Sequence, residues 1–414
     1  MTVGSRGDVA PFTGLGHGLA RAGHEVTLVT HSRFETLAAR AGIGFHALPV
    51  DPRAELESSR GRALHRSTTG AGKLVRVVAM ARALAGEMAD DLVAAARVSD
   101  ALLLSGSVAP LGHAIAEGLA LPSLGLNLQP LGATREFPPP MLGIGSWGAL
   151  GNRVAGVGLN LAVEQVFASA VPAVRARLGL PPKGTAAALR ARERQGWPVL
   201  HGFSPRVVAR PRDWRSGLDV AGYWWPYDGD DRLPDDLREF IDAGPPPVFV
   251  GLGSATVPDP TWISSEIVRA LRRAGLRGVI QRGWAGLTTT GDDMLTIGEV
   301  PHSALFPHMA AVVHHAGAGT TAAGLRAGVP AVPVPIQFDE GFWADRLVAL
   351  GVAPSAVPLR RLTANTLGAA LARATRDPMY GERARELGAR IRDEDGVGPV
   401  VAAVARMDGR GRER

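Results

Sequence analysis

Short apolar runs recur along the chain, and each is followed by a glycine-rich or polar turn and then by a longer stretch with helical spacing. In the first half these runs cover residues 1–3, 25–30, 101–104 and 124–126. Such short, continuous apolar runs are typical of strands that helices cover on both faces of a parallel sheet. We therefore expect an α/β fold, with a first helix over residues 12–22. The first run is short for a strand, so either the strand starts upstream or it is unusually brief.

The second half repeats this alternation after an acidic, turn-rich segment and Gly244-Pro245-Pro246-Pro247. Its predicted strands are residues 248–251, 276–280, 294–297, 310–313 and 331–336. A last helical pattern covers roughly residues 379–405. A chain of 414 residues is too long for one ordinary core, and this arrangement predicts two α/β domains.

The most informative polar residues follow directly after two of these predicted strands. One apolar run ends in His314-His315, and a glycine turn and Thr320-Thr321 follow it. The next run ends just before Asp339-Glu340. Both strands of a parallel βαβ unit finish at the same sheet edge, so the two polar clusters should lie close together. Backbone N–H groups at a helix N-terminus, hydroxyls and imidazole suit a phosphate, and carboxylates suit sugar hydroxyls. The two polar clusters together predict a nucleotide-sugar site.

This arrangement resembles the donor signature of the UDP-glycosyltransferase superfamily, in which HHGGAGTT is followed by a G-x-P turn and an acidic D-Q pair. The resemblance extends over almost the whole chain and is strongest to the bacterial natural-product and sterol glucosyltransferase branches. Four further windows carry it: Gly4 to Pro11, Gly23 to Thr27, Gly202 to Pro205 with Gly222 to Trp224, and Gly251 to Ser254.

The resemblance implies the GT-B architecture, in which two Rossmann-like, doubly wound parallel-sheet domains face each other across a cleft. We expect an acceptor-binding domain at residues 1–226, a linker at 227–247 and a donor-binding domain at 248–385. Residues 386–414 are expected to form a C-terminal helix and basic tail that pack back on the first domain. Closure of the cleft over the donor would make the linker near Asp228 a hinge.

The resemblance also assigns the donor-binding residues. Because strand side chains alternate between faces, we expect only one of His314 and His315 to meet the ligand; by resemblance it is His315, on the α-phosphate. Glu340 stands where the family has glutamine, which donates as well as accepts hydrogen bonds. The expected donor-binding residues are Ser254, Arg282, Trp284, Val300, His302, His315, Gly317, Gly319, Thr320, Thr321, Asp339 and Glu340.

Asp8 is the predicted catalytic base. It lies in Gly7-Asp8-Val9-Ala10-Pro11, where many relatives carry histidine and the glycopeptide and sterol branches carry aspartate. An ordinary aspartate has a pKa of about 3.9 and is a weak base, but burial would raise its basicity. The alternative is a helix N-cap just before a proline-started helix, and the two roles are compatible.

The acceptor side is less defined. Residues 57–69 form a polar, arginine-rich stretch that predicts a mobile loop, and the proline-rich stretch at 137–141 is a second irregular segment. Loops at the carboxyl edge of an α/β sheet commonly shape the ligand pocket, so we expect both to form the acceptor wall. Asn127, Met141 and Trp147 are the expected acceptor-binding residues.

Composition narrows the partners. The chain lacks cysteine, starts without a signal-peptide pattern and has no apolar run near the ~20 residues needed to span a bilayer, which favours a cytoplasmic protein. Weak contact with a membrane surface remains open. The 45 basic and 39 acidic residues give a net charge of +6, but the arginines are scattered among acids, so we expect no nucleic-acid partner. Neither H-x-x-x-H with a partner acid nor a strand-end D-x-D occurs, and we expect no metal and no other cofactor.

The implied activity is inverting, metal-independent transfer of a hexose from a UDP- or dTDP-sugar to a hydroxyl of a lipophilic acceptor. Polyketide, terpenoid, sterol and glycopeptide aglycones are the expected acceptor classes, as in antibiotic biosynthesis. Direct displacement would give a β-linkage from an α-linked donor. Two alternatives stay open at this point: a nucleotide-sugar 2-epimerase, and a catalytically silent homologue that activates or scaffolds another transferase.

Overall fold

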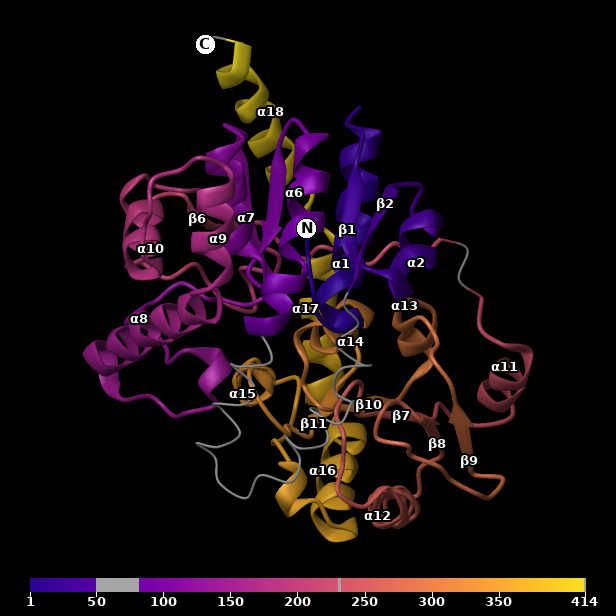
Figure 1. The fold of residues 1–414 in the computed structure, drawn as a ribbon. Helices are drawn as coiled ribbons and strands as arrows, with labels where there is room; N and C mark the ends of the chain where they lie inside the picture. Colours follow the sequence, from indigo (N-terminus) through magenta and orange to yellow (C-terminus); the bar gives the residue numbers. More distant parts are fainter. Residues whose placement is uncertain (50–81, 230–231, 413–414) are drawn as a thin grey trace.

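The computed structural model describes residues 1–49, 82–229 and 232–412, with side chains described through residue 407. Two parallel-sheet α/β halves are stacked on each other, with the first half uppermost in Figure 1 and the second half, in orange, below it. This is the predicted fold class. The predicted loop at residues 57–69 lies outside the described residues, and the proposed domain boundaries stay a prediction.

The first half contains two runs of parallel strands. β1 (Thr27–His31) pairs with β2 (Gly44–Leu48). The other strands form a sheet in the order β3 (Leu102–Ser105), β4 (Ser123–Asn127), β5 (Val199–His201) and β6 (Leu218–Val220).

The N-terminal residues join these two sheets. The amino group of Met1 donates to Leu103 O at 2.8 Å, and the N–H of Ser105 donates to Met1 O at 3.0 Å. On the other side, the N–H of Thr2 donates to Val29 O at 3.0 Å. Residues 1–3 therefore lie in the layer between β1 and β3, as the sequence predicts, although they are not an assigned strand.

The second half has one parallel sheet, in the order β11 (Ala331–Pro333), β10 (Ala311–His314), β7 (Val248–Gly251), β8 (Gly278–Gln281) and β9 (Met294–Ile297). β11 is shorter than the predicted run to residue 336. Pro333 and Pro335 have no N–H group to donate to a neighbouring strand, which explains the early end.

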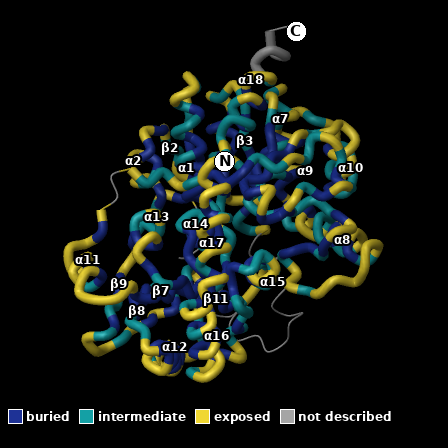
Figure 2. Tube along the Cα trace, turned by 180° about the vertical axis from the view of Figure 1, so that it is seen from behind, coloured by how far each residue is buried: buried dark blue, intermediate teal, exposed yellow. Residues whose placement is uncertain are grey.

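Helices cover both faces of this sheet, as its alternating side chains require. Val248 and Val250 are buried against α12 and α16, whereas Phe249 between them is buried against α13. In Figure 2 the strands are dark blue and the outer helices carry the exposed yellow segments. The helices are α1 (Arg6–Arg21), α2 (Glu35–Arg40), α6 (Ala89–Arg97), α7 (Ala109–Gly118), α8 (Gly148–Val166), α9 (Ala170–Arg177), α10 (Thr185–Arg194), α11 (Asp235–Asp242), α12 (Pro260–Ala274), α13 (His302–Leu305), α14 (Ala318–Ala327), α15 (Glu340–Ala349), α16 (Ala364–Arg376), α17 (Pro378–Arg392) and α18 (Gly398–Arg412).

The C-terminal pattern predicted at residues 379–405 is two helices, α17 and α18. The Asp395 carboxylate accepts the N–H groups of Val397 and Gly398, at 3.1 and 2.8 Å, and so starts the second helix. The Trp224 indole N–H donates to Gly396 O at 2.8 Å. Val400 and other apolar residues of α18 pack with the first-half core, so the chain returns to the half where it began (Figure 1, yellow).

Among the described residues, no single helix is both long and apolar enough to cross a membrane. One pair, α8 and α9, reaches that length and apolarity when taken together, with a bend of 59° between the two helices.

Docking of α18 leads to a stability prediction. Val400 has 0% of its side chain exposed, so Val400→Ala should lower the free energy of unfolding by about 2 kcal/mol through lost packing. Val98, which is 88% exposed, is the matched control, and Val98→Ala should change stability by less than about 0.5 kcal/mol. Urea unfolding followed by circular dichroism measures both variants. Equal midpoints for the two would contradict the packing assigned to α18.

Candidate active site

The loops after three neighbouring strands meet at one edge of the second-half sheet. Gly251 at the end of β7 is in register with His314 at the end of β10, which is in register with Pro333 at the end of β11. The N–H of Val334 donates to His314 O at 2.7 Å and extends the contact one residue further. The histidine–glycine–threonine loop and the acidic loop are therefore neighbours, as parallel pairing predicts.

The two adjacent histidines have different surroundings. His314 is 1% exposed, and its Nδ1 accepts the N–H of Ala316 at 3.1 Å. His315 is partly exposed, and its buried Nδ1 has no hydrogen-bond partner among the described residues. Burial lowers the pKa of His315 to about 4, so the ring is neutral at pH 7. Of the pair, His315 is the more exposed ring, and its Nδ1 has no partner within the described chain.

Two glycines fix the His315 ring. A Cβ on Gly253 would lie 2.6 Å from His315 Cε1, and a Cβ on Gly317 would lie 2.4 Å from His315 Nε2. Gly253 also has a φ of +57°, a conformation that side chains with a Cβ rarely adopt. The imidazole is thus held between the backbones of two loops.

Gly317 is the N-cap of α14. The first amide that bonds within the helix is that of Thr321, whose N–H donates to Gly317 O at 2.9 Å. The N–H groups of residues 318–320 have no intrahelical acceptor, and with the helix dipole they form a site suited to an anion. Gly319 is exposed and Thr320 partly exposed, whereas the buried Thr321 hydroxyl has no hydrogen-bond partner among the described residues.

The predicted nucleoside wall lies around the same edge. The N–H of Trp284 donates to Gly253 O at 3.1 Å, which joins this loop to the one that holds His315. Ser254 and Arg282 are exposed, and Val300 is buried. The His302 ring stacks on Phe306 with ring centroids 4.3 Å apart, and burial lowers the pKa of His302 to about 4.

Asp339 and Glu340 differ in their burial and in their hydrogen bonds. Asp339 Oδ2 accepts the indole N–H of Trp343 at 2.8 Å, and Asp339 remains partly exposed. Glu340 is only 6% exposed, and its Oε2 accepts the backbone N–H groups of Ile336 and Gln337 at 2.5 and 2.7 Å. Glu340 therefore holds its own loop. Burial raises the pKa of Asp339, and it raises the pKa of Glu340 to about 7.

Backbone strain is concentrated in these two loops. Three non-glycine residues in the described chain have a positive φ: Ala316 at +65°, Phe338 at +51° and Ala120 at +54°. Ala316 follows His315, and Phe338 precedes Asp339. Strained residues cluster at functional sites, and sequence reasoning assigned a role to neither residue. For Ala316 the sequence does contain an indication of a positive φ, because the family pattern has glycine at that position.

Asp8 lies in a helix, which corrects the prediction that helix α1 starts at residue 12. Ser5 is the N-cap, and its N–H and hydroxyl donate to Asp8 Oδ2 at 2.8 and 2.9 Å. These hydrogen bonds let the helix start at Arg6, with Pro11 inside it. Asp8 is therefore the third helical residue and not the N-cap. Burial raises the pKa of Asp8, and no partner is recorded for its Oδ1 among the described residues.

The first half brings Asp8 toward the acidic loop of the second half. The charge of Asp8 contributes to the raised pKa of Asp339, after burial as the main cause. Nearby, Arg6 Nη1 and Glu299 Oε2 form an ion pair at 2.9 Å, and the Arg33 guanidinium lies 5.8 Å from the Trp284 ring centroid. Helix α1, which carries Asp8, also contacts α14, so the start of the first half lies against the second half near this edge.

The predicted acceptor residues are spread more widely. Asn127 ends β4 beside Gly106, where an added Cβ would lie 2.8 Å from Asn127 Oδ1. Met141 is partly exposed in the short 3-10 helix η2 (Pro140–Leu142), which contacts α15 of the second half. Trp147 is 67% exposed just before α8, the helix at the left of Figure 1. Asn127, Met141 and Trp147 therefore lie on three different elements, and their role in acceptor binding stays a prediction.

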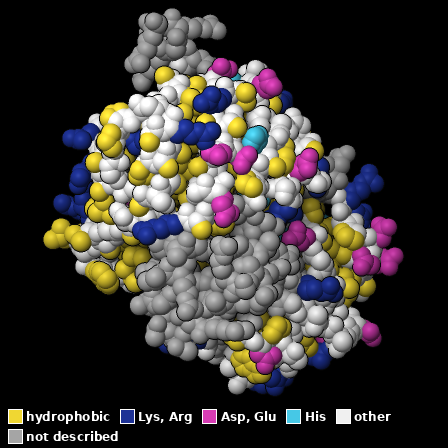
Figure 3. Space-filling view, in the orientation of Figure 1, with side chains coloured by type: hydrophobic (Ala, Val, Ile, Leu, Met, Phe, Trp, Pro, Cys, Tyr) yellow, Lys and Arg dark blue, Asp and Glu magenta, His cyan; other side chains and the backbone are white. Residues whose placement is uncertain are grey.

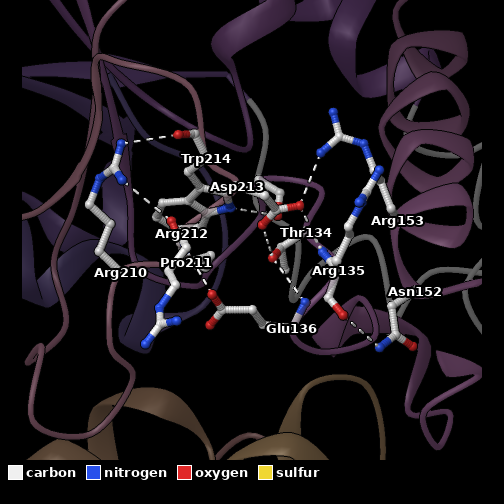
Figure 4. A network of polar contacts seen from close by, with 11 residues as sticks. Thr134, Arg135, Glu136, Asn152, Arg153, Arg210, Pro211, Arg212, Asp213 and Trp214 are labelled. Carbon is white, nitrogen blue, oxygen red and sulfur yellow. Dashed lines mark hydrogen bonds and ion pairs between the residues drawn. The ribbon is translucent and has the colours of Figure 1, made fainter. Parts of the chain in front are cut away.

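A polar network anchors the segment that leads into η2 (Figure 4). The Asp213 carboxylate accepts the N–H of Arg135 at 2.9 Å and pairs with Arg153 at 3.0 Å. Glu136 Oε1 accepts the N–H of Arg212 at 2.7 Å. This network fixes the base of the proline-rich stretch, whose Phe137 ring lies 5.3 Å from that of Phe342 in α15.

No group of three or more His, Asp or Glu residues in the described part of the chain is arranged to hold a metal ion.

Comparisons with known proteins show the family of the chain. Residues 1–138 match the Glycosyltransferase family 28 N-terminal domain, and residues 279–407 match the Erythromycin biosynthesis protein CIII-like, C-terminal domain. The O-mycaminosyltylonolide 6-deoxyallosyltransferase of Streptomyces fradiae is 35% identical over 405 residues, which cover 96% of this chain and 94% of that protein.

Sterol 3-beta-glucosyltransferases are also similar. UGT80B1 of Arabidopsis thaliana is 31% identical over 98% of this chain and 67% of that protein. The chain covers a smaller part of other sterol 3-beta-glucosyltransferases. It spans 64% of UGT80A2 of the same plant and 27% of the Candida albicans enzyme.

Solved structures show the same fold. The glycosyltransferase of kitacinnamycin has a TM-score of 0.68 at 21% identity, covering 98% of this chain and 97% of that one. VinC, crystallised with dTDP, has a TM-score of 0.66 at 21% identity, covering 99% and 98%. With a relative 35% identical along nearly its full length and this shared fold, the chain belongs to the UDP-glycosyltransferase superfamily of GT-B enzymes and is a glycosyltransferase.

Proposed function

We propose that this glycosyltransferase moves a hexose, with inversion, from a UDP- or dTDP-sugar to a hydroxyl of a lipophilic acceptor. The observation that carries the proposal is the contact between helix α1, which holds the buried Asp8, and helix α14, whose N-terminus follows His315. Relatives named for sterol and macrolide-type substrates support a lipophilic acceptor. The dTDP bound to VinC supports a nucleoside diphosphate donor.

The donor diphosphate would bind at the start of α14. There the free N–H groups of residues 318–320 and the Thr320 hydroxyl can donate to its oxygens, and the helix dipole favours its charge. The neutral His315 ring can donate one further hydrogen bond. These groups stabilise negative charge that grows on the leaving diphosphate, and we propose that they do so without a divalent cation. Trp284, Val300 and His302 would line the nucleoside.

Asp8 would remove the proton from the acceptor hydroxyl. The acceptor oxygen then bonds to the anomeric carbon as the bond from that carbon to the diphosphate breaks. Attack from the face opposite the leaving group turns an α-linked donor into a β-linked product. Desolvation makes the Asp8 carboxylate a stronger base than an exposed aspartate, and Oδ1 is the oxygen not engaged with Ser5.

Asp339 would accept hydrogen bonds from sugar hydroxyls, and Glu340 would support it. Because the pKa of Glu340 is about 7, its carboxyl is largely protonated in mildly acidic solution. Oε2 then still accepts from the loop backbone, and the protonated oxygen can donate. A protonated glutamate offers the combination of donor and acceptor that the family's glutamine provides.

The partners we propose are small molecules in a cytoplasmic setting. Among the described residues on the face shown in Figure 3, basic and acidic side chains are interspersed, which gives little support to nucleic-acid binding.

A donor and acceptor panel tests the function. UDP- and dTDP-sugars are incubated with sterols, macrolide aglycones and small aryl alcohols, and products are identified by mass spectrometry. We expect a mass gain of one hexose on at least one lipophilic acceptor, with a β-linkage by NMR. Conversion of donor without acceptor to an epimer or glycal would instead indicate an epimerase. Donor binding with no turnover would indicate a silent homologue.

Asp8→Asn should lower kcat by at least about 100-fold, because the amide cannot accept the hydroxyl proton. Ser5→Ala is the control, since it removes one capping bond and keeps the carboxylate. The Kd for UDP should stay within about twofold in both variants, measured by calorimetry. Near-normal turnover in a folded Asp8→Asn protein would leave Asp8 with a capping role only.

Gly253→Ala should weaken UDP binding by about tenfold or more, because the added Cβ would displace the His315 ring. Gly275→Ala is the matched control: Gly275 has a φ of +72°, and an added Cβ would meet nothing within 4 Å. Both variants should lose similar stability in thermal melts, so only the affinity difference reports on His315. Unchanged UDP affinity in Gly253→Ala would show that the His315 ring does not contribute to diphosphate binding.

Glu340→Gln should flatten the pH dependence of stability. A carboxyl whose folded pKa is raised stabilises the fold at low pH, and this contribution is lost as pH rises from about 4.5 to about 7. The wild type should therefore lose on the order of 2–3 kcal/mol across that window through this group, whereas the glutamine variant should not. Urea unfolding at pH 5 and pH 8 measures the difference. Parallel pH profiles would mean that Glu340 titrates normally.

A further inference from the structure

Phe338 combines two energetically unfavourable features. Its φ of +51° lies in the left-handed region, which is unfavourable for a residue with a bulky side chain. The residue is also 56% exposed, although a phenyl ring is a strong candidate for burial. Among the described residues, no aromatic ring packs on it. A strained, exposed aromatic residue at an active-site loop suggests that a ligand uses it.

The position of Phe338 indicates which ligand. The next residue is Asp339, in the loop that follows β11 and reaches the same sheet edge as His315. The Phe338 carbonyl oxygen would lie 3.3 Å from a Cβ on Gly143, directly after the η2 turn that contacts α15. In that turn Leu142 is 44% exposed and Met141 is partly exposed. Two segments with exposed apolar residues, one from each half, are therefore adjacent beside the acidic loop.

The different chemistry of the donor and the acceptor indicates which of them Phe338 would contact. The sugar donor carries phosphates and hydroxyls, and the backbone N–H groups, imidazole and carboxylates of the proposed site suit those groups. A phenyl ring offers no hydrogen bond, and it gains most from covering an apolar surface. Building on the proposed function, we infer that Phe338 is an acceptor-binding, specificity-determining residue whose ring packs against the apolar body of the acceptor, opposite Leu142 and Met141.

Phe338→Gly tests this inference, because glycine adopts a positive φ without strain. The melting temperature should be equal to or a few degrees above that of the wild type. The acceptor KM should rise about tenfold for sterols and macrolide aglycones and less than threefold for a small aryl alcohol, since the lost contact scales with apolar area. Donor KM and the Kd for UDP should stay within twofold. Phe338→Leu should restore part of the loss.

Ala120→Gly is the matched control. Ala120 has a φ of +54° in an exposed turn between α7 and β4, so this variant relieves similar strain away from the site. It should raise the melting temperature by a similar amount and leave every kinetic constant unchanged.

The remaining outcomes separate the two proposals. If the wild type binds a sterol in the presence of UDP and Phe338→Gly binds it equally well by calorimetry, the Phe338 assignment is wrong and the proposed function stands. A change in donor KM instead would assign the ring to the sugar and overturn the inference. A clear fall in melting temperature would indicate a structural role and also overturn it. A wild type that binds no lipophilic alcohol and transfers no sugar would refute both proposals.

Discussion

The parallel pairing of β7, β10 and β11 is the constraint on which the site depends. Because the three strands run in the same direction, the residues after each of them reach one sheet edge. That is how Gly253, His315 and Asp339, which are far apart in sequence, come to share a site. The helix that follows β10 then directs its unpaired N–H groups to the same edge. The chemistry at this edge follows from strand direction and from close contact between glycine backbones and one imidazole.

Desolvation determines the protonation states at this edge. Burial lowers the pKa values of His302 and His315, so both rings are neutral and can each donate a hydrogen bond without carrying a charge. The same effect raises the pKa values of Asp8, Asp339 and Glu340. A site with neutral imidazoles, free helix amides and carboxyls of raised basicity suits a reaction in which a proton leaves a hydroxyl as negative charge moves to a diphosphate.

Much of this could be predicted from the sequence, because apolar runs and strand-end polar clusters follow from sheet geometry. The strands at 248–251 and 294–297 have the predicted bounds, and the neighbouring positions of His315 and Asp339 follow from parallel topology. The start of α1 was missed because Gly4 to Pro11 contains two glycines and a proline, while the Ser5–Asp8 capping that outweighs them is a three-dimensional contact. The inward turn of Glu340 and the positive φ of Phe338 were missed for a related reason. Both depend on how the chain closes after β11, which local propensity does not encode.

A crystal structure with UDP is the most direct test of the central claim, which is that one edge of the second half binds the donor opposite Asp8. We expect the diphosphate oxygens within hydrogen-bonding distance of the N–H groups of residues 318–320 and of the His315 ring, with the terminal phosphate directed toward the space between Asp8 and Asp339. UDP bound elsewhere, or bound here with its terminal phosphate directed away from Asp8, would contradict the claim.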